Sequence, residues 1–341
     1  MVSGERELFN HLTRYSKLKI VNSQLKVAVL MGGIGEERDI SIQSGNCVAQ
    51  SLKEAGLNVV TADIGPDNLD ILDEASIDVF FLALHGRFGE DGQLQQILED
   101  KSLLYTGSGP KASRLAFDKL ASKKRFSKAG VAVPKAINFD AQRRTKELEK
   151  ELLQLSERFV VKPVRQGSTI GVSIVDDPMS ALAAAQDCSS KFGDCMIEEF
   201  ILGREITVGI LEGRALPIIE IKSKTGFYDY HAKYIDEGTE FLFDTIREPG
   251  LIGKINAAAL DCFNALGCRG FGRVDIILGD EEEVYALEVN NIPGLTSHSL
   301  LPRAAAKAGL SMSDLCVRII EAAYSSLVGH SAEPSRSPRR S

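Results

Sequence analysis

Two short apolar segments near the end of the chain carry four polar side chains of the types that form metal and phosphate sites. Arg273 and Asp275 are two residues apart in the first segment, and Glu288 and Asn290 are two residues apart in the second. Residues two apart on a β-strand point to the same face, so a hairpin of the two segments brings the four side chains onto one patch. Carboxylate and amide oxygens suit Mg²⁺, which proteins usually hold with one or two carboxylates together with substrate phosphates. The pattern therefore predicts a metal-assisted phosphate site.

A simpler interpretation is that the four side chains are the solvent-exposed face of an ordinary hairpin. Polar residues that alternate along a hairpin most often have that role. The loop that follows favours a site instead, because backbone N–H groups and hydroxyls between Gly294 and Ser299 can receive a charged substrate.

The elements that position such residues are predicted from apolar periodicity. The first third of the chain alternates apolar runs with helical stretches, which indicates a small parallel α/β sheet. Its strands are expected at residues 27–31, 59–62 and 79–84, with a helix over 41–55. Ligands of such sheets bind beyond the carboxyl ends of the strands, and Gly32-Gly33 and His85-Gly86 stand at two of those ends.

Two residues near these ends have both a structural and a functional interpretation. Glu37 begins the predicted helix, where a carboxylate stabilises the positive end of the helix dipole. Its functional alternative is to bind a substrate ammonium. His85 ends an apolar run, where a histidine is more often structural than catalytic, although the glycines after it permit close approach of a ligand to the backbone.

The middle of the chain is predicted to be an α+β unit that contacts phosphates. The pattern indicates helices over 119–130 and 179–191 and strands over 158–163 and 195–200. Lys119 starts the first helix, and Lys162 precedes the loop Gly167-Ser168-Thr169. Each lysine alone is most simply a solvated side chain, but an ammonium beside a glycine-containing loop can cover a phosphate. The loop is not a P-loop, because no G-x-x-x-x-G-K-[S/T] occurs in the chain.

The last third of the chain is predicted to form mostly antiparallel strands from residue 206, with helices over 254–266 and 311–324. Residues 220–250 are too polar for a core and are predicted to form a lid. Residues 1–24 are predicted to be an accessory extension, and residues 329–341 have the composition of a disordered tail.

Composition narrows the class of protein. With 341 residues, 44% hydrophobic and 26% charged, the chain is long enough for two or three domains of ordinary globular composition. No apolar run approaches the roughly 18 to 20 residues of a membrane helix, and the first 24 residues lack a secretory core. A net charge of −7, with no basic stripe outside residues 123–125 and the tail, argues against nucleic-acid binding. Six scattered cysteines without a C-x-x-C pair indicate free thiols in a reducing compartment, so a cytoplasmic enzyme or binding protein is expected.

Several motifs, in order along the chain, carry a family resemblance. They are Val29-Leu30-Met31-Gly32-Gly33 with Glu37-Arg38; Ala83-Leu84-His85-Gly86-Arg87 with Gly89-Glu90-Asp91-Gly92; Tyr105-Thr106-Gly107-Ser108-Gly109; Asp118-Lys119; Val161-Lys162-Pro163; Tyr228-Asp229-Tyr230 with Ala232-Lys233-Tyr234; Gly272-Arg273-Val274-Asp275; and Leu287-Glu288-Val289-Asn290 through Pro293-Gly294 to Ser299-Leu300. Together they resemble the D-alanine–D-alanine ligase family of the ATP-grasp superfamily, over roughly residues 25–325.

The resemblance implies roles for the matching residues. The metal ligands would be Asp275, Glu288 and Asn290, which would hold two Mg²⁺ or Mn²⁺ ions per subunit. The ATP-binding residues would be Lys119, Lys162, Ser168, Glu198, Glu199, Phe200 and Ile201, the last four as an adenine-binding strand partly through backbone groups, with Glu205 at the ribose. The substrate-binding residues would be Glu37 for the ammonium of the first D-alanine, Ser299 and Leu300 for the carboxylate of the second, and His85. The catalytic residues would be Glu37 hydrogen-bonded with Ser168 and Tyr234, Lys233 facing the transferred phosphate, and Arg273 with the Gly294 N–H at the oxyanion.

The implied fold is a three-domain ATP-grasp fold of the α/β (α+β) class. An N-terminal parallel α/β substrate domain would span residues 25–118, and two α+β domains that clasp ATP would span 119–204 and 205–328. The implied activity is ATP-dependent ligation of two D-alanines to D-alanyl-D-alanine through an acyl phosphate, for peptidoglycan precursors of the cell wall. The implied assembly is a homodimer, with neither nucleic acid nor membrane insertion.

Two alternatives stay open. A catalytically silent ATP-binding subunit would have lost a metal ligand or Arg273, and neither is lost. Ligation of another D-amino acid pair depends on pocket side chains alone, although retention of Lys233-Tyr234 favours D-alanine over D-lactate as second substrate. Two departures from the family pattern concern packing: Asn291-Ile292 stand where the family usually has Thr, and 241–246 lack the usual Pro-Ala of the lid.

Overall fold

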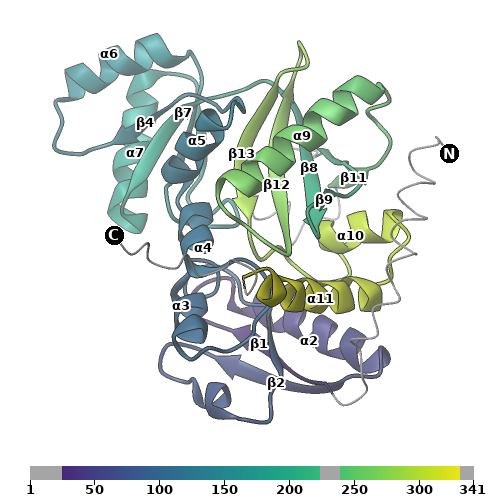
Figure 1. Ribbon diagram of the computed structural model, residues 1–341. Coiled ribbons are helices and arrows are strands. Elements are labelled where there is room, and N and C mark those ends of the chain that lie inside the picture. The colour runs from purple at the N-terminus through teal and green to yellow at the C-terminus, as the bar shows by residue number, and fades with distance from the viewer. Residues whose placement is uncertain (1–24, 223–238, 331–341) are drawn as a thin grey trace, which may run out of the picture.

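Three β-sheets form the framework of the described chain, and each has its own helices (Figure 1). The computed structural model describes residues 25–222 and 239–330, with only the backbone of residues 327–330. One sheet is parallel and two are antiparallel, and helices cover them, which confirms the predicted α/β (α+β) class.

The first sheet is parallel, as predicted, and has the strand order β2-β1-β3. Its strands are β1 (Lys26–Gly32), β2 (Asn58–Ile64) and β3 (Val79–Leu82); the helices along this part of the chain are α2 (Arg38–Glu54), α3 (Gln93–Asp100) and α4 (Pro110–Phe117), with a 3-10 turn at Asp70–Asp73. Alternate residues of β1 pack against α2 on one face and against α3 on the other. Both faces are covered, and this is why β1 and β3 read as continuous apolar runs.

The second sheet is antiparallel, with the order β4-β7-β5-β6. Its strands are β4 (Ala136–Phe139), β5 (Phe159–Pro163), β6 (Ser173–Val175) and β7 (Cys195–Glu199), and the helices are α5 (Lys119–Lys128), α6 (Thr145–Leu155) and α7 (Pro178–Phe192). α6 and α7 bury Leu152 and Ala185 against Phe159 and Val161 of β5. α7 begins at Pro178 because Asp177 caps it, with the Ser180 N–H donating to Asp177 Oδ1 over 2.9 Å.

The third sheet is antiparallel and has the order β11-β10-β8-β12-β13, with β9 paired to β8. Its strands are β8 (Gly203–Leu211), β9 (Arg214–Ala215), β10 (Ile219–Lys222), β11 (Glu240–Leu242), β12 (Phe271–Gly279) and β13 (Val284–Asn290), and the helices are α9 (Pro249–Ala265), α10 (Leu300–Lys307) and α11 (Met312–His330). α9 buries Leu251, Ile255 and Ala259, one from each helical turn, against this sheet.

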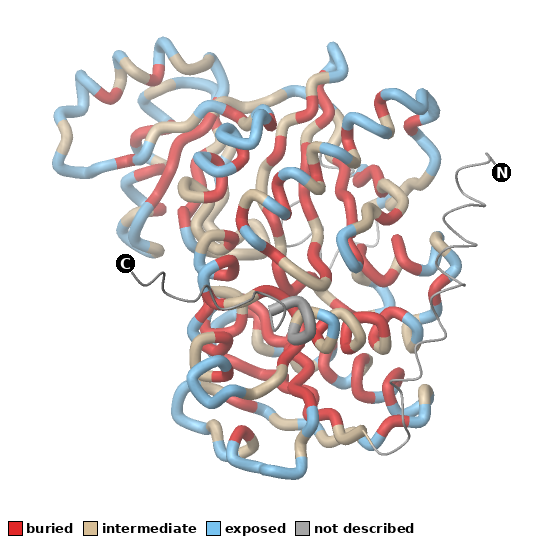
Figure 2. The backbone as a smooth tube through the Cα atoms, in the orientation of Figure 1, coloured by how far each residue is buried: buried red, intermediate tan, exposed pale blue. Residues whose placement is uncertain are grey.

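One apolar core joins the first sheet to the third. α11 lies between them and packs against α2, as Figure 1 shows, and residues of β1, α2, α10 and α11 belong to the same buried cluster. In the tube of Figure 2, buried positions run along β8, β12 and β13 and continue into this junction. α4 and α5 contribute Ala112, Ala116 and Phe126 to the core of the third sheet. The hairpin β12–β13 is thereby held against helices from earlier parts of the chain.

Two expectations from the sequence need correction. The helix predicted over 254–266 begins five residues earlier, at Pro249, because the Glu248 carboxylate accepts from the Gly250 N–H over 2.9 Å and caps the helix. The prediction that residues 220–250 form a polar lid is wrong at both ends of that range. Ile221 and Ile246 are buried, and β10 pairs with β11. The centre of the range, residues 223–238, lies outside the described residues, as do the whole of the predicted extension and residues 331–341 of the predicted tail.

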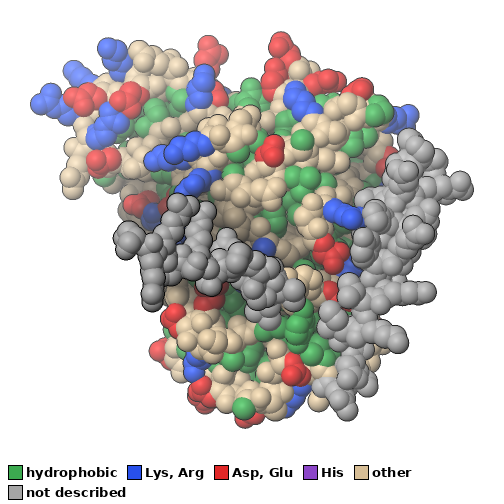
Figure 3. Space-filling view, in the orientation of Figure 1, with side chains coloured by type: hydrophobic (Ala, Val, Ile, Leu, Met, Phe, Trp, Pro, Cys, Tyr) green, Lys and Arg blue, Asp and Glu red, His purple; other side chains and the backbone are tan. Residues whose placement is uncertain are grey.

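The described surface carries charges of both signs (Figure 3), and the cysteines form no disulfides. On the face in Figure 3, Lys and Arg side chains are interspersed with Asp and Glu side chains across the described surface. All six cysteines are free thiols, and five of them are buried. Within residues 25–222 and 239–330, no helix combines the length and hydropathy that crossing a membrane requires.

Candidate active site

β12 and β13 pair as the predicted hairpin and bring the four polar residues together. Arg273 lies opposite Asn290, and Asp275 lies opposite Glu288 in the antiparallel register. A register shift follows directly after Asp275, so the pairing changes beyond the four residues and not among them. We call Arg273, Asp275, Glu288 and Asn290 the hairpin patch.

Asp275 is the centre of hydrogen bonding in the hairpin patch. Arg273 donates to it through Nε and Nη2, both at 2.9 Å, and Asn290 Nδ2 donates over 2.9 Å. Thr207 Oγ1, on the neighbouring strand β8, donates over 2.6 Å. Asp275 is itself only 7% exposed. The interpretation of these residues as a simple solvent-exposed face is therefore wrong for Asp275.

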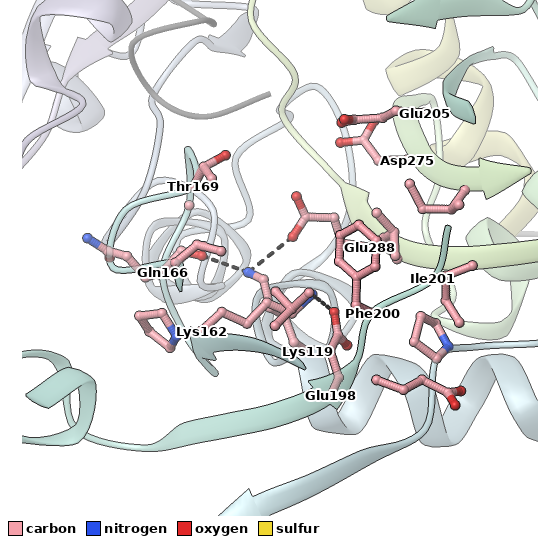
Figure 4. Close-up of a pocket in the computed structure, with 18 of the residues that line it drawn as sticks. Lys119, Lys162, Gln166, Thr169, Glu198, Phe200, Ile201, Glu205, Asp275 and Glu288 are labelled. Carbon is pink, nitrogen blue, oxygen red and sulfur yellow. Dashed lines mark hydrogen bonds and ion pairs between the residues drawn. The ribbon is translucent and has the colours of Figure 1, made fainter. Parts of the chain in front are cut away.

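Lys119 joins the hairpin patch to the second sheet. Its Nζ lies 3.1 Å from Glu288 Oε2 and donates to the Gln166 carbonyl over 2.7 Å. Figure 4 shows the Lys119 ammonium between these two groups. Lys119 starts α5 as predicted, where the Asp118 carboxylate accepts from the Ala121 N–H over 2.9 Å. The N-cap at Asp118 thus sets where the lysine leaves the helix.

The hairpin patch fits a divalent cation on its chemistry. Like charges at facing positions of an antiparallel pair destabilise a sheet, and Asp275 and Glu288 are such a pair. In this structure Arg273 and Lys119 supply the compensating positive charge. Two carboxylates and the amide oxygen of Asn290 are the hard donors that Mg²⁺ or Mn²⁺ takes, with the remaining positions filled by phosphate oxygens. Among the described residues, no group of three or more His, Cys, Asp or Glu side chains is arranged to hold a metal ion.

A cavity adjoins the hairpin patch, between the second and third sheets (Figure 4). The cavity is lined by the predicted nucleotide residues Lys119, Lys162, Glu198, Glu199, Phe200, Ile201 and Glu205, together with Asp275 and Glu288. Val160 from one sheet and Ile277 and Leu287 from the other provide apolar walls. An apolar slot that ends in cations and carboxylates suits a flat base with a charged tail.

Glu198 is buried between two lysines at the wall of this cavity. Lys162 Nζ pairs with Glu198 Oε1, and Lys123 Nζ lies 2.8 Å from Glu198 Oε2. Burial opposes ionisation of Glu198, but the two ammonium charges outweigh it and hold the pKa of Glu198 below its ordinary value. Burial also lowers the pKa of Lys123, an effect that the Glu198 charge partly offsets. The cluster keeps a carboxylate ionised where water is largely excluded.

The segment after Glu198 supplies side chains and a backbone edge to the cavity. The Glu199 N–H donates to the Lys135 carbonyl over 3.0 Å, and the Phe200 N–H donates to the Arg158 carbonyl over 2.9 Å. These two N–H groups therefore bind the protein framework and not the cavity. The Arg158 guanidinium lies 4.3 Å from the centre of the Phe200 ring and holds the ring in place.

Ser168, in the loop after β5, contacts Glu37 from the first part of the chain. Glu37 is the residue before α2, is 9% exposed, and accepts a hydrogen bond from Ser168 Oγ, as predicted. The end of β1 positions this helix, since the Gly32 N–H donates to Ser41 Oγ over 2.9 Å. Contact between residues 131 positions apart closes the loop over Glu37.

Glycines around Glu37 make this contact possible. A Cβ on Gly86 would lie 2.6 Å from Glu37 Oε2, and a Cβ on Gly167 would lie 2.9 Å from the same atom. Gly86 also has a φ of +67°, which an L side chain rarely adopts. Ser168 and Thr169 have φ of 52° and 62° without being glycine. Two strained residues in one loop indicate that the surrounding contacts hold this loop in place.

His85 uses both ring nitrogens within the protein. Nδ1 lies 3.1 Å from the Ile292 carbonyl and Nε2 lies 3.0 Å from Ser44 Oγ. Glu90 Oε1 lies 3.6 Å from Nδ1, and burial raises the pKa of Glu90. The Leu295 N–H in turn donates to Ser44 Oγ over 3.3 Å. These contacts support the structural interpretation of His85, which anchors the loop after β13 to the first sheet.

The loop after β13 ends at the N-terminus of α10, where Ser299 and Leu300 lie. Ser299 Oγ accepts from the Thr296 N–H over 3.1 Å, and Leu300 is the first residue of the helix. A Cβ on Gly294 would lie 2.7 Å from Ser299 Oγ, so the Ser299 side chain packs directly against the Gly294 backbone. Asn291, which departs from the family pattern, is buried and donates to Ser113 Oγ over 2.9 Å, so the departure concerns packing.

Reasoning from the sequence missed several residues that shape the site. Lys123, Thr207 and Gln166 contact predicted site residues across 40 or more positions of sequence. Lys123 has one sequence signal, its spacing of four from Lys119 on a predicted helix. Lys233 and Tyr234, predicted for the lid, lie outside the described residues.

Known proteins match most of the chain in sequence. The family described as D-ala D-ala ligase C-terminus matches residues 126–321. A D-alanine–D-alanine ligase of Syntrophotalea carbinolica is 43% identical over 300 residues, which are 88% of this chain and 96% of that protein.

Solved structures agree in fold. The D-alanine–D-alanine ligase from Bacillus anthracis is 35% identical with a TM-score of 0.80 and covers 90% of this chain and 99% of its own. A structure of the D-alanine–D-alanine ligase from Bacillus anthracis complexed with ATP has a TM-score of 0.77 at 32% identity, with 90% and 99% coverage.

Proposed function

The chain belongs to the D-alanine–D-alanine ligase family, and on that premise we propose that it joins two molecules of D-alanine to D-alanyl-D-alanine while ATP is cleaved to ADP and phosphate. The observation that carries the proposal is that one cavity is lined by Lys119, Lys162 and Glu198 at one part and by Asp275 and Glu288 at another. The product is a precursor unit for peptidoglycan.

We propose that ATP occupies this cavity with its base between the apolar walls. Glu198 and the segment Glu199–Ile201 would bind the adenine, with Ile201 contributing backbone groups, and Glu205 would bind the ribose. Lys119 and Lys162 would contact phosphates. Support comes from their ammonium groups, which pair with Glu288 and Glu198 in this structure. Phosphate oxygens can replace these carboxylates as partners of the two lysines.

The first D-alanine would bind with its ammonium at Glu37. A carboxylate that is 9% exposed gains strongly from a cation, and the Ser168 hydroxyl orients it. The carboxylate of this D-alanine would attack the γ-phosphorus of ATP, forming an acyl phosphate and releasing ADP. A free carboxylate is a poor acyl donor, and the acyl phosphate is a good one.

The hairpin patch would serve this transfer in two ways. Asp275, Glu288 and Asn290 would hold Mg²⁺ or Mn²⁺, two ions per subunit, and these ions would neutralise charge on the phosphates during transfer. Arg273 and the Gly294 N–H would stabilise the oxygen that becomes negative when the acyl carbon turns tetrahedral. Such donors contribute about 3–4 kcal/mol each in comparable sites.

The second D-alanine would bind with its carboxylate at Ser299 and the N-terminus of α10. The first N–H groups of a helix are unpaired within it and attract anions. The amine of this D-alanine, in its neutral form, would attack the acyl carbon, and phosphate would leave with the former carboxylate oxygen. His85 would act by holding the loop that presents Gly294 and Ser299.

We propose that the loop carrying Ser168 and the segment carrying Lys233 and Tyr234 exclude water during the reaction. An acyl phosphate hydrolyses readily, so exclusion of water protects the intermediate. Tyr234 would add a hydrogen bond to the Glu37–Ser168 pair, and Lys233 would face the transferred phosphate.

Assembly and domain limits are part of the same proposal. We propose a homodimer in the cytoplasm, with a substrate domain over residues 25–118 and two ATP-clasping domains over 119–204 and 205–328. Support for three units comes from the three sheets, each with its own strand order.

Product identification tests the activity. The protein would be incubated with ATP, Mg²⁺ and D-alanine, and ADP release would be followed together with mass spectrometry of the products. D-alanyl-D-alanine and ADP in equal amounts are expected. Turnover with D-lactate or D-serine but not with D-alanine as the second substrate would refute the proposed specificity.

A further inference from the structure

A buried charge cluster at the base end of the cavity includes a lysine that the proposed reaction does not use. Lys123 is 5% exposed and Glu198 is 2% exposed. Lys123 Nζ lies 2.8 Å from Glu198 Oε2, while Lys162 pairs with the other carboxylate oxygen. Two buried cations therefore face one buried anion.

Lys123 reaches this cluster from the helix that also carries Lys119. The two lysines are four residues apart in α5, so they lie on one face of the helix. Lys119 Nζ lies 3.1 Å from Glu288 of the hairpin patch, and Lys123 Nζ reaches Glu198. Lys123 also donates to the carbonyl of Pro134, a residue that lines the cavity, over 3.0 Å. One face of α5 therefore contacts both the phosphate end and the base end of the cavity.

The excess of cations has a physical consequence when a nucleotide binds. In the proposed site Lys162 turns to a phosphate, and its ion pair with Glu198 then weakens. Of the ion pairs that Glu198 forms with described residues, the one with Lys123 remains. A carboxylate buried without a cation becomes neutral instead of staying charged.

We propose that Lys123 is a positioning residue that holds Glu198 as an ionised acceptor for the 6-amino group of adenine. Glu198 thereby favours 6-aminopurine over 6-oxopurine nucleotides. This inference rests on the proposed function, because it places the base of ATP at Glu198. An ionised carboxylate only accepts hydrogen bonds, so it pairs with an amino group and opposes a carbonyl oxygen at the same position. A site built for a hydrogen-bond donor rejects a ligand that lacks it, because its own acceptor is left unpaired.

The test uses Lys123→Met and measures binding of ADP and of inosine diphosphate, with Mg²⁺, by calorimetry. Loss of a hydrogen bond to a charged group is expected to weaken ADP binding about tenfold or more. Inosine diphosphate binding should change less, so the preference for ADP falls. The KM for ATP should rise in step with the loss of ADP affinity, while kcat stays within about threefold, because Lys123 is remote from the transferred phosphate. Lys124→Met, at an exposed position of the same helix, is the matched control.

A double substitution separates positioning from general support of the fold. In a Glu198→Gln background, Lys123→Met should change ADP affinity by less than about twofold, because its partner is already neutral. Lys123→Gln, which keeps a donor for the Pro134 carbonyl but no charge, should behave like Lys123→Met and replaces it where that variant does not fold. Glu198→Gln alone, whose amide also donates, should lower the preference for ADP over inosine diphosphate.

Three results would overturn the inference. They are an unchanged preference for ADP in the Lys123 variants, an equal loss of ADP affinity in both backgrounds, and an unchanged preference in Glu198→Gln. Binding of nucleotide is measured without amino acids. Failure of the wild-type protein to form D-alanyl-D-alanine would therefore count against the proposed function and leave the binding test readable.

Discussion

At the scale of single residues, the hairpin patch places two carboxylates face to face, an arrangement that would be unfavourable without neighbouring cations. Asp275 and Glu288 face each other, and each has a cation beside it. Arg273 is held by two hydrogen bonds to Asp275 and is therefore already oriented for a substrate anion. Preorganised donors of this kind need not rearrange during the reaction, which is the source of their catalytic value.

Glu288→Gln tests the metal role of the hairpin patch. The substitution keeps the shape of the side chain but removes a charged ligand, so kcat/KM should fall about 100-fold or more. The melting temperature should change little, because the Glu288 side chain is partly exposed. Steady-state kinetics over a range of Mg²⁺ concentrations measures the effect. Glu281→Gln, in the exposed turn of the same hairpin, is the control, and equal activities of the two variants would contradict the assignment.

Ser168→Ala tests the contact between the loop and Glu37. The Ser168 hydroxyl donates to the Glu37 carboxylate, which would bind the first D-alanine. Loss of a hydrogen bond to a charged group should lower kcat/KM for D-alanine about tenfold or more. ATP affinity should change less, because Ser168, which the family resemblance also implied for ATP binding, turns its hydroxyl to Glu37 and is not among the residues that line the cavity. Ser173→Ala, at an exposed position of β6, is expected to behave as the wild type.

At the scale of elements, α5 positions two of the cations described at the site, Lys119 and Lys123. Its N-cap residue Asp118 accepts from the Ala121 N–H over 2.9 Å and from Arg165 over 2.6 Å. Arg165 belongs to the loop that continues to Ser168. The Lys119 N–H also donates to the Val164 carbonyl over 3.1 Å. The start of α5 and the base of the loop therefore form one unit.

Substitutions at Asp118 separate the helix cap from the ion pair. Asp118→Ala should lower the free energy of unfolding by about 1 kcal/mol, because it removes the cap. Asp118→Asn keeps an oxygen for the Ala121 N–H and should restore most of that stability. The Arg165 partner is half exposed, and exposed ion pairs contribute little. Denaturant unfolding of both variants measures the difference, and equal losses would show that the ion pair and not the cap supports α5.

The predictable part of the fold and site follows from local patterns. The hairpin β12–β13 was predictable because its polar residues alternate with apolar ones and a polar turn joins them. The sequence did not predict the start of α9, because Pro249 and Gly250 are residue types typical of loops. The structure shows that Glu248 caps the helix there. The contact of Lys123 with Glu198 spans 75 residues, and no local pattern reveals it.

The same limit applies to the segment 220–250. Its polar composition predicted a lid, but Ile221 and Ile246 are buried where the third sheet meets helices from other parts of the chain. Lys307 pairs with Asp244, and the Arg303 guanidinium lies 4.8 Å from the centre of the Phe241 ring. Tertiary contacts with α10 determine the structure of this segment, and composition alone cannot predict such contacts.

At the scale of the whole molecule, the buried cysteines provide a test of the packing. Five of the six thiols are buried, and Cys47 is partly exposed. Burial raises the pKa of Cys268 to about 11 and that of Cys316 to about 12. Only the thiolate reacts, so these thiols are protected by both access and ionisation.

A thiol-reactive dye at neutral pH should therefore modify at most one cysteine of the native protein quickly, and peptide mapping should identify it as Cys47. Unfolding in guanidinium chloride should expose all six. Rapid modification of two or more thiols in the native protein would contradict the packing of the cores described here.

The central claim is that the chain forms an acyl phosphate from D-alanine and ATP and transfers the acyl group to a second D-alanine. D-alanine labelled with ¹⁸O in its carboxylate tests this most directly, because the bridging oxygen of the acyl phosphate leaves with the phosphate. Mass spectrometry should find one ¹⁸O atom in inorganic phosphate for each D-alanyl-D-alanine formed. Dipeptide formed with unlabelled phosphate, or no dipeptide at all, would contradict the account.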